Sequence, residues 1–249
     1  MSGHSHWAGI KHKKALIDAK RGKLWSKLAR NIIVAAKAGG ADPAANLSLR
    51  YAIDKAKDAN MPKDSIEKAI KKGAGDLGGA NFEEIIYEGY GANGVAVLCE
   101  VLTDNRNRTA GELRHIFDKR GGALGASGCV AWMFQKKGLF TVGADTVDED
   151  ALMEIALEAG ADDIELNGDA FEITCSLDAY EHLKQTLKEK EIETKVAEIS
   201  QVPSNYINLD QEAAKKILDL LEILEDHDDV QNVYANFDIS PEILKQMDT

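Results

Sequence analysis

The sequence predicts an α/β protein of the α+β type, in which an N-terminal three-helix domain is followed by two ferredoxin-like α/β domains, one inserted in the other. Three observations lead to this prediction. The N-terminal third has helical periodicity, the chain then alternates short strand patterns with helices, and its last helix and strand have no partners beside them in the sequence. With 249 residues, the chain is long enough for three cores.

The N-terminal third is expected to form three helices. In the first, which begins near Lys23, apolar residues recur every four positions and the cations keep to the other side. Glycine takes the left-handed conformation that ends a helix without steric cost, so we expect this helix to end at Gly39-Gly40. The second helix follows Pro43 and the third follows Pro62, which is pre-set for a first helical turn.

After a glycine-rich stretch expected to be a linker, the pattern changes to strands. Glycines 89, 91 and 94 match the dinucleotide-binding fingerprint, but that motif must open a helix, and here a strand pattern follows it. We therefore interpret these glycines as a hairpin turn. The expected elements are strands at 85–88 and 95–102, a helix at 109–119 and a strand at 129–134.

The next segment has the element order β-α-β-β-α-β of a ferredoxin-like unit. A helix at 211–225 and a strand at 230–237 remain at the end of the chain, and the segment before the ferredoxin-like unit lacks just such a pair. We infer that the unit is inserted into a discontinuous domain. The expected domains are a basic helical nucleic-acid-binding domain at 1–80, a discontinuous α/β domain at 81–135 plus 204–249, and an inserted acidic ferredoxin-like domain at 136–203.

Charge is divided unevenly along the chain. Residues 1–80 hold 16 Lys/Arg and 7 Asp/Glu, whereas residues 141–249 hold 7 and 28, within a net charge of −12. Lys and Arg gain affinity for nucleic acid by displacing the counterions condensed on phosphates. A basic end on an acidic body is therefore typical of a protein that binds a polyanion with one end.

The basic charge is concentrated in the first 41 residues, which contain nine Lys/Arg and a single acid. Most charge runs are solvated helix faces, which is the alternative interpretation here. The acidic remainder of the chain and two tryptophans able to stack on bases favour nucleic-acid binding instead. The residues predicted to contact nucleic acid are Trp7, Lys11, Lys13, Lys14, Lys20, Arg21, Lys23, Lys27 and Arg30.

A second cationic group lies in the motif Thr103-Asp104-Asn105-Arg106-Asn107-Arg108-Thr109. The spacing Thr109-x-x-Glu112 resembles a capping box, which places the arginines ahead of a helix N-terminus. Cations there oppose the helix dipole unless an anion offsets them, so this pattern suggests a phosphate or partner site. The residues concerned are Arg106, Arg108 and Arg114. The alternative is that they pair with acids of the fold, namely Glu100, Asp104 or Asp118.

Several classes of protein are disfavoured. The three cysteines are far apart and form no C-x-x-C pair, which is typical of buried thiols in a reducing compartment. No apolar run is long enough for a membrane helix, and no secretory signal opens the chain, so we expect a cytoplasmic protein without a membrane partner.

Catalysis finds little support either. The chain has no nucleophile elbow and no H-E-x-x-H motif, and we expect neither an enzyme nor a small-molecule substrate nor a cofactor. His4 and His6 are the candidates for a metal site, but no carboxylate or cysteine completes one, so no metal is expected.

Several long motifs occur in one order along the chain, at residues 3–7, 10–14, 18–23, 86–91, 103–109 and 228–234. Together they give the chain a resemblance to the YebC/PmpR family, whose relatives include the mitochondrial translational activator of cytochrome c oxidase. The resemblance covers nearly the whole chain. It implies a three-domain α/β protein, cytoplasmic in bacteria, commonly described as a DNA-binding transcriptional regulator, with some members acting on translation at the ribosome.

These features support one main function and two alternatives. We expect a DNA-binding transcriptional regulatory protein whose basic end neutralises duplex phosphates, although no recognition-helix signature is evident. The first alternative is a ribosome-associated translation factor that binds ribosomal RNA through the same end and contacts ribosomal proteins through its acidic domains. The second is an acidic scaffold that binds only proteins.

Overall fold

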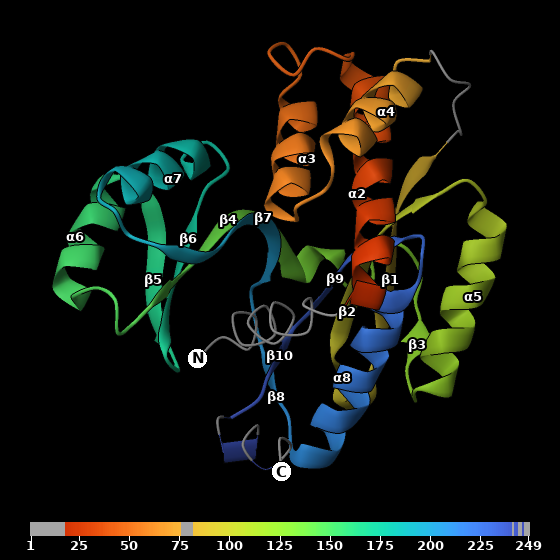
Figure 1. The fold of residues 1–249 in the computed structure, drawn as a ribbon. Helices are drawn as coiled ribbons and strands as arrows, with labels where there is room; N and C mark the ends of the chain where they lie inside the picture. Colours follow the sequence, from red (N-terminus) through yellow and green to blue (C-terminus); the bar gives the residue numbers. More distant parts are fainter. Residues whose placement is uncertain (1–17, 76–81, 241, 244–245, 247–249) are drawn as a thin grey trace.

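The computed structural model describes residues 18–75, 82–240, 242–243 and 246, with the side chains of 18–21 excepted. It has the predicted α+β architecture (Figure 1): three N-terminal helices stand against two four-stranded sheets, each with its own helices. Within the described part of the chain, every helix is too short or too polar to cross a lipid bilayer.

The three N-terminal helices are α2 (Asp18–Gly39), α3 (Leu47–Asp58) and α4 (Lys63–Gly73). As predicted, α2 ends at the glycine pair, and Gly40 has a φ of +88°. Asn46 ties the next turn together, because its side chain caps α3 and also donates to the carbonyls of Ala35 and Gly40. At Gly73 a Cβ would lie 2.5 Å from the carbonyl oxygen of Ile33, so glycine allows α4 to pack closely on α2.

The first sheet contains strands from both sides of the insertion. Its order is β3-β1-β2-β9, with every pair antiparallel. Helices α5 and α8 pack against it around a core that includes Phe117 and Ile217. The elements are β1 (Glu83–Tyr90), β2 (Ala96–Thr103), α5 (Arg106–Lys119), β3 (Ala123–Leu124), α8 (Gln211–Asp226) and β9 (Val230–Ala235).

The second sheet has the ferredoxin-like order β5-β6-β4-β7 and is covered by α6 and α7. Its elements are β4 (Phe134–Gly143), α6 (Glu149–Glu158), β5 (Ala161–Asn167), β6 (Ala170–Cys175), α7 (Tyr180–Glu189) and β7 (Thr194–Pro203). The chain enters this unit along β4 and leaves it along β7, and β9 then returns to pair with β2, so one α/β unit is inserted in the other. We propose that the three domains have the boundaries predicted from the sequence, which are 1–80, 81–135 plus 204–249, and 136–203. Two short strands, β8 (Ile207–Asn208) and β10 (Phe237–Asp238), pair in parallel.

Two sequence predictions about this fold were wrong. Residues 129–134 do not form a strand; they contain the single 3₁₀ turn η2 (Ala131–Met133), and β4 begins only at Phe134. The reason is tertiary. The buried carboxylate of Glu88 accepts hydrogen bonds from the backbone N–H groups of Gly128, Val130 and Ala131, which folds this apolar segment into a turn.

The second wrong prediction concerns the start of α5. The helix begins at Arg106 rather than Thr109, because the side chain of Asn105 caps it by accepting from the Arg108 N–H. Thr109 is therefore one turn inside the helix and does not form a capping box. The two arginines of the motif lie in the first turn of α5 instead of ahead of it.

Candidate nucleic-acid interface and the adjoining charged pocket

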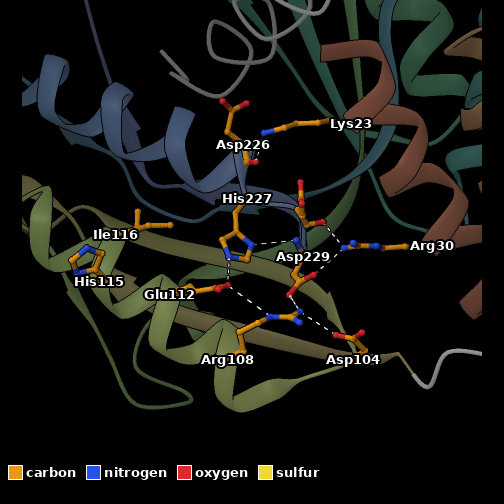
Figure 2. A pocket seen from close by; sticks show the side chains of 11 residues that line it. Lys23, Arg30, Asp104, Arg108, Glu112, His115, Ile116, Asp226, His227 and Asp229 are labelled. Atoms are coloured by element: carbon orange, nitrogen blue, oxygen red, sulfur yellow. Dashed lines mark hydrogen bonds and ion pairs between the residues drawn. The ribbon is translucent and has the colours of Figure 1, made fainter. Parts of the chain in front are cut away.

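A pocket of about 640 Å³ lies where α2, α5 and the turn between α8 and β9 meet. Figure 2 shows Lys23 and Arg30 reaching into it from α2, and Arg108 and Glu112 reaching into it from α5. The pocket therefore lies between the basic N-terminal helices and the discontinuous α/β unit. Its lining carries charges of both signs.

Asp229 is the centre of this pocket. Its side chain is only 6% exposed, and both of its carboxylate oxygens accept hydrogen bonds. Arg30 Nη1 donates to Oδ1 at 2.9 Å, and Arg108 Nη2 donates to Oδ2 at 2.7 Å. The hydroxyls of Thr103 and Thr109 also donate to Oδ2, at 3.1 and 2.8 Å. One carboxylate thus links α2, β2, α5 and the start of β9.

These bonds decide the ionisation of Asp229. Burial alone would raise its pKa, since a charged carboxylate loses hydration inside the protein. The hydrogen bonds from Arg108, Thr109 and Thr103, with the charge of Arg108, outweigh burial and hold the pKa below its ordinary value of 3.8. The carboxylate is therefore a fixed anion at neutral pH.

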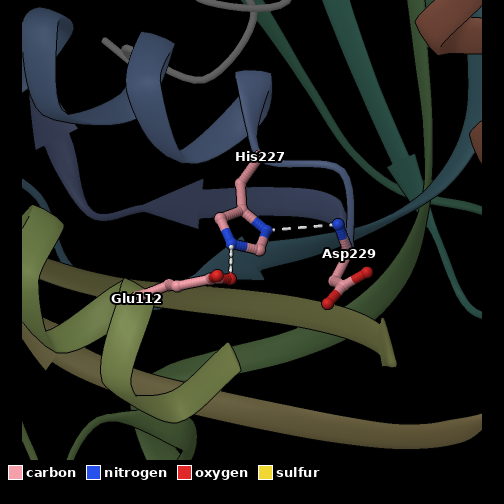
Figure 3. A group of neighbouring side chains, drawn as sticks. All are labelled: Glu112, His227 and Asp229. Carbon is pink, nitrogen blue, oxygen red and sulfur yellow. Dashed lines mark hydrogen bonds and ion pairs between the residues drawn. The ribbon is translucent and has the colours of Figure 1, made fainter. Parts of the chain in front are cut away.

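His227 lies beside Asp229 and faces Glu112 (Figure 3). Its Nδ1 accepts the backbone N–H of Asp229 at 3.1 Å, so in this arrangement that nitrogen carries no proton. The proton is then on Nε2, which donates to Glu112 Oε2 at 2.9 Å. The two hydrogen bonds fix the orientation of the ring.

Glu112, His227 and Asp229 offer ligand atoms within 4.8 Å of one another, a spacing that a metal ion could use. The Asp229 carboxylate, however, already accepts four side-chain hydrogen bonds. The guanidinium of Arg108 also lies 4.0 Å from Glu112. A cation would have to displace these donors, so the three residues fit a hydrogen-bond network better than a metal site.

Cations of α2 bind backbone carbonyls in the last turn of α8 and in the turn that follows it. Lys23 Nζ donates to the Asp226 carbonyl at 3.2 Å, Lys27 Nζ donates to the Glu225 carbonyl, and Arg30 also donates to the Asp228 carbonyl. The last carbonyls of a helix have no partners within the helix and carry the negative end of its dipole. Cations from another domain satisfy them here.

Comparison with known proteins agrees with the architecture. Residues 5–76 match the model of the TACO1/YebC protein N-terminal domain, and residues 82–237 match that of the TACO1/YebC second and third domain. The chain belongs to the TACO1/YebC family. The resemblance inferred from the sequence motifs is thereby confirmed.

Individual family members are similar over their whole length. A protein of Natranaerobius thermophilus is 54% identical over 98% of this chain and 99% of its own. A protein of Dictyoglomus thermophilum is 54% identical over 99% of this chain and 100% of its own. Both are named probable transcriptional regulatory protein. The crystal structure of a conserved hypothetical protein from Aquifex aeolicus has a TM-score of 0.83 at 51% identity, covering 96% of this chain and 99% of that one.

The structure locates part of the nucleic-acid-binding set predicted for this TACO1/YebC protein. Lys23 and Arg30 line the pocket from α2, and Lys27 on the same helix binds the Glu225 carbonyl of α8. Lys23 binds the Asp226 carbonyl of α8, and Arg30 binds Asp229, just ahead of β9. Lys20 and Arg21 belong to α2, but their side chains lie outside the described set, and Trp7, Lys11, Lys13 and Lys14 lie outside the described residues. A nucleic-acid role for these nine residues stays a prediction.

The three arginines predicted to form a second cationic site do not lie together in the structure. Arg108 points into the pocket and pairs with Asp104 at 3.0 Å as well as with Asp229. Arg106 and Arg114 are exposed on α5 and make no ion pair with another described residue. Sequence reasoning missed the acid that organises the pocket. The signal was available in the motif at 228–234, where an acid directly precedes a buried strand.

Proposed function

We propose that this TACO1/YebC protein is a cytoplasmic nucleic-acid-binding regulator of gene expression, with DNA as its first expected target, and that it acts by binding rather than by catalysis. The observation that carries the proposal is the division of charge: 16 Lys/Arg against 7 Asp/Glu in residues 1–80, and 7 against 28 in residues 141–249. The names of its relatives, probable transcriptional regulatory proteins, support the same function.

Exposed cations remain available for phosphate on the helical domain. Arg50 on α3 and Lys68 and Lys71 on α4 are exposed, and none of them forms an ion pair within the described part of the chain. The pairing of Lys23, Lys27 and Arg30 with α8 fixes the helical domain against the body. Phosphates can therefore meet a preformed cationic surface, at the end of the molecule opposite in charge to the inserted unit.

A second candidate function is supported by what α3 and α4 lack. Bases in the major groove are read chiefly by Arg, Asn and Gln, and these two helices contain Arg50 but no Asn or Gln. Their cations are otherwise lysines, whose contacts with phosphates carry no sequence information. This composition favours a target recognised by backbone and shape, as ribosomal RNA would be for a ribosome-associated translation factor.

The test is competition binding of the full-length protein to a candidate promoter duplex, a random-sequence duplex and intact ribosomes at several salt concentrations. A preference for promoter DNA of roughly a thousandfold or more over random duplex would establish the transcriptional function. Equal, weak binding to both duplexes with tight binding to ribosomes would instead establish the translational one.

A charge-reversal variant tests whether nucleic acid is the partner at all. Lys13→Glu with Lys23→Glu should abolish binding, because the reversed charges repel phosphates and no longer displace their counterions. Lys188→Glu with Lys190→Glu makes the same change of charge on the inserted unit and should leave affinity nearly unchanged. If the first variant binds as the wild type does, the protein is a scaffold for other proteins.

A further inference from the structure

The most exposed large apolar side chain in the described part of the chain is Trp132, which is 72% exposed. The next, Leu157, is 53% exposed. Leaving an indole in water forgoes about 25 cal/mol for every Å² of apolar surface, so a fold gains nothing from this placement. Aromatic side chains are enriched where proteins contact their partners, so Trp132 is a candidate contact residue.

The turn that carries Trp132 is held from several sides. Glu88 accepts from the N–H groups of Gly128, Val130 and Ala131 at 2.6, 2.8 and 2.7 Å. On the far side of Trp132, the N–H of Ser204 donates to the Met133 carbonyl at 2.8 Å. The backbone is therefore fixed both before and after the tryptophan, and little conformational entropy is lost when a partner binds.

The ring itself is oriented as well. Its Nε1–H donates to the Cys129 carbonyl at 3.1 Å, and the Tyr90 hydroxyl donates to the same carbonyl at 3.0 Å. Because the one polar group of the indole is bonded within its own turn, it offers a partner only the apolar ring. A partner for such a surface must be flat and must not depend on a hydrogen bond to the indole.

The charge of the segment that carries Trp132 favours an anionic partner. From residue 119 to residue 144 the chain has four Lys/Arg and no Asp/Glu, in a protein with 42 acids. Arg120 and Lys137 are paired with acids elsewhere in the fold, whereas Lys136 is exposed and forms no ion pair with another described residue. Glu88, the acid that binds this turn, is buried and its charge is held by backbone N–H groups.

We propose that Trp132 is a stacking platform for an unpaired base of single-stranded nucleic acid. Lys136, which follows it in the same segment, would bind the adjoining phosphate. The proposal rests on the proposed nucleic-acid function and adds a second contact, outside the basic helical domain. Every base has a π-face, so stacking is tolerant of sequence and needs no hydrogen bond from the indole. Bases within a duplex are already stacked on each other and would not use this contact.

Binding of the full-length protein to a single-stranded oligonucleotide and to the matching duplex tests the proposal. Trp132→Ala should weaken single-strand binding by roughly 5- to 150-fold, the loss expected for one base stack, and should leave duplex binding and the salt slope unchanged. Trp132→Phe keeps an aromatic face and should stay within about threefold of the wild type. Leu157→Ala, which removes an exposed apolar side chain from α6, is the matched control and should have no effect.

The outcomes separate this proposal from the proposed function. If Trp132→Ala binds single strands as well as the wild type while Lys13→Glu with Lys23→Glu abolishes binding, nucleic-acid binding stands and the stacking platform is disproved. An equal loss on single strand and duplex would also disprove it, because it would indicate a general defect. If the wild type binds no single strand, the stacking platform is disproved, while the proposed function is decided separately by binding to the duplexes and to ribosomes.

A measurement on the wild-type protein removes any dependence on the folding of variants. A single strand containing 5-iodouridine is bound and irradiated, and the crosslinked tryptic peptides are identified by mass spectrometry. The proposal predicts a crosslink to the peptide of residues 121–136, at Trp132. Crosslinks confined to residues 1–80 would overturn it while supporting the basic helical domain as the interface.

Discussion

Asp229 shows how much of this structure depends on single carboxylates. It is buried, accepts hydrogen bonds from four side chains on three elements, and holds the first turn of α5 against the start of β9. Removing one partner of a buried polar network leaves the others without bonds, which costs more than the net value of the bonds themselves. Its neighbour Asp228 is exposed and offers a direct comparison.

We predict that Asp229→Asn lowers the free energy of unfolding by about 1–3 kcal/mol, because the amide replaces an ionised acceptor and places an N–H₂ group against donors. Urea unfolding at pH 7 measures this difference. Asp228→Asn should change stability by less than about 0.5 kcal/mol, as an exposed substitution does. Equal effects of the two variants would contradict the assigned role of Asp229.

The free energy of unfolding should also decrease at low pH, because two buried carboxylates, Glu88 and Asp229, become protonated. Burial would raise the pKa of Glu88, but three backbone N–H bonds outweigh it and hold the pKa below its ordinary value of 4.5. The pKa of Asp229 lies below 3.8 for the analogous reason. A carboxylate with a lowered folded-state pKa stabilises the protein above its unfolded-state pKa, and this contribution is lost as the pH falls toward the lowered value.

We therefore expect full stability from these groups above about pH 5 and a progressive loss below about pH 4. Urea unfolding between pH 7 and pH 3 would follow it. The double variant Glu88→Gln with Asp229→Asn should start less stable and lose less on acidification. If its stability falls with pH as steeply as that of the wild type, other groups cause the acid sensitivity.

At the scale of elements, α5 contains a glycine, Gly111, that no neighbouring atom requires. Gly111 lies in the helix interior on an exposed face, and a Cβ there would meet nothing within 4 Å. Glycine is the least favourable helix residue after proline, mainly because its backbone loses the most freedom on folding. Gly122, just past the end of α5, differs: a Cβ there would lie 2.5 Å from the Tyr90 carbonyl oxygen.

We predict that Gly111→Ala raises the free energy of unfolding by about 1 kcal/mol, since it gains helix propensity without a clash. Gly122→Ala should lower it, because backbone would have to move. Thermal or urea unfolding of the two variants checks both signs. A destabilising effect of Gly111→Ala would mean that the α5 surface is more crowded than the structure shows.

At the scale of the whole molecule, the helical domain contacts both α/β units. Besides the contacts of α2 with α8, Lys55 on α3 lies 3.8 Å from Glu198 on β7, and the rings of Tyr51 and Tyr180 meet edge to face at 6.4 Å. Figure 1 shows α2 standing above α8 and α3 close to the end of the second sheet. The basic helices are thus fixed in the angle between the two sheets.

The cationic contacts of α2 should protect the end of α8. We predict that Lys27→Ala with Arg30→Ala speeds amide hydrogen exchange in residues 225–229 by about 3- to 10-fold, the effect of losing hydrogen bonds of ordinary net strength. The middle of α8 should exchange unchanged. Lys68→Ala with Lys71→Ala removes the same charge from α4 and serves as the control. Unchanged exchange in the first variant would show that α2 does not hold this turn.

Local patterns in the sequence determined most of the secondary structure. Four-residue periodicity and the glycine pair at 39–40 predicted α2 and its end, and the strand and helix order predicted the ferredoxin-like unit and its insertion. The helices and strands could be predicted because each depends on residues a few positions apart. The insertion could be predicted because the last helix and strand have no partners beside them in the sequence. The long motifs also identified the family, and the charge division was readable by counting.

Only the tertiary structure decided how the charges are used. Arg30 meets Asp229 across 199 positions, and Glu88 folds a segment 40 to 43 positions away into the turn that presents Trp132. No local period encodes contacts of this range, because they depend on how sheets and helices pack. For the same reason Arg108 could not be assigned from its motif: its partner Asp229 enters from the other end of the chain, through the strand that closes the first sheet.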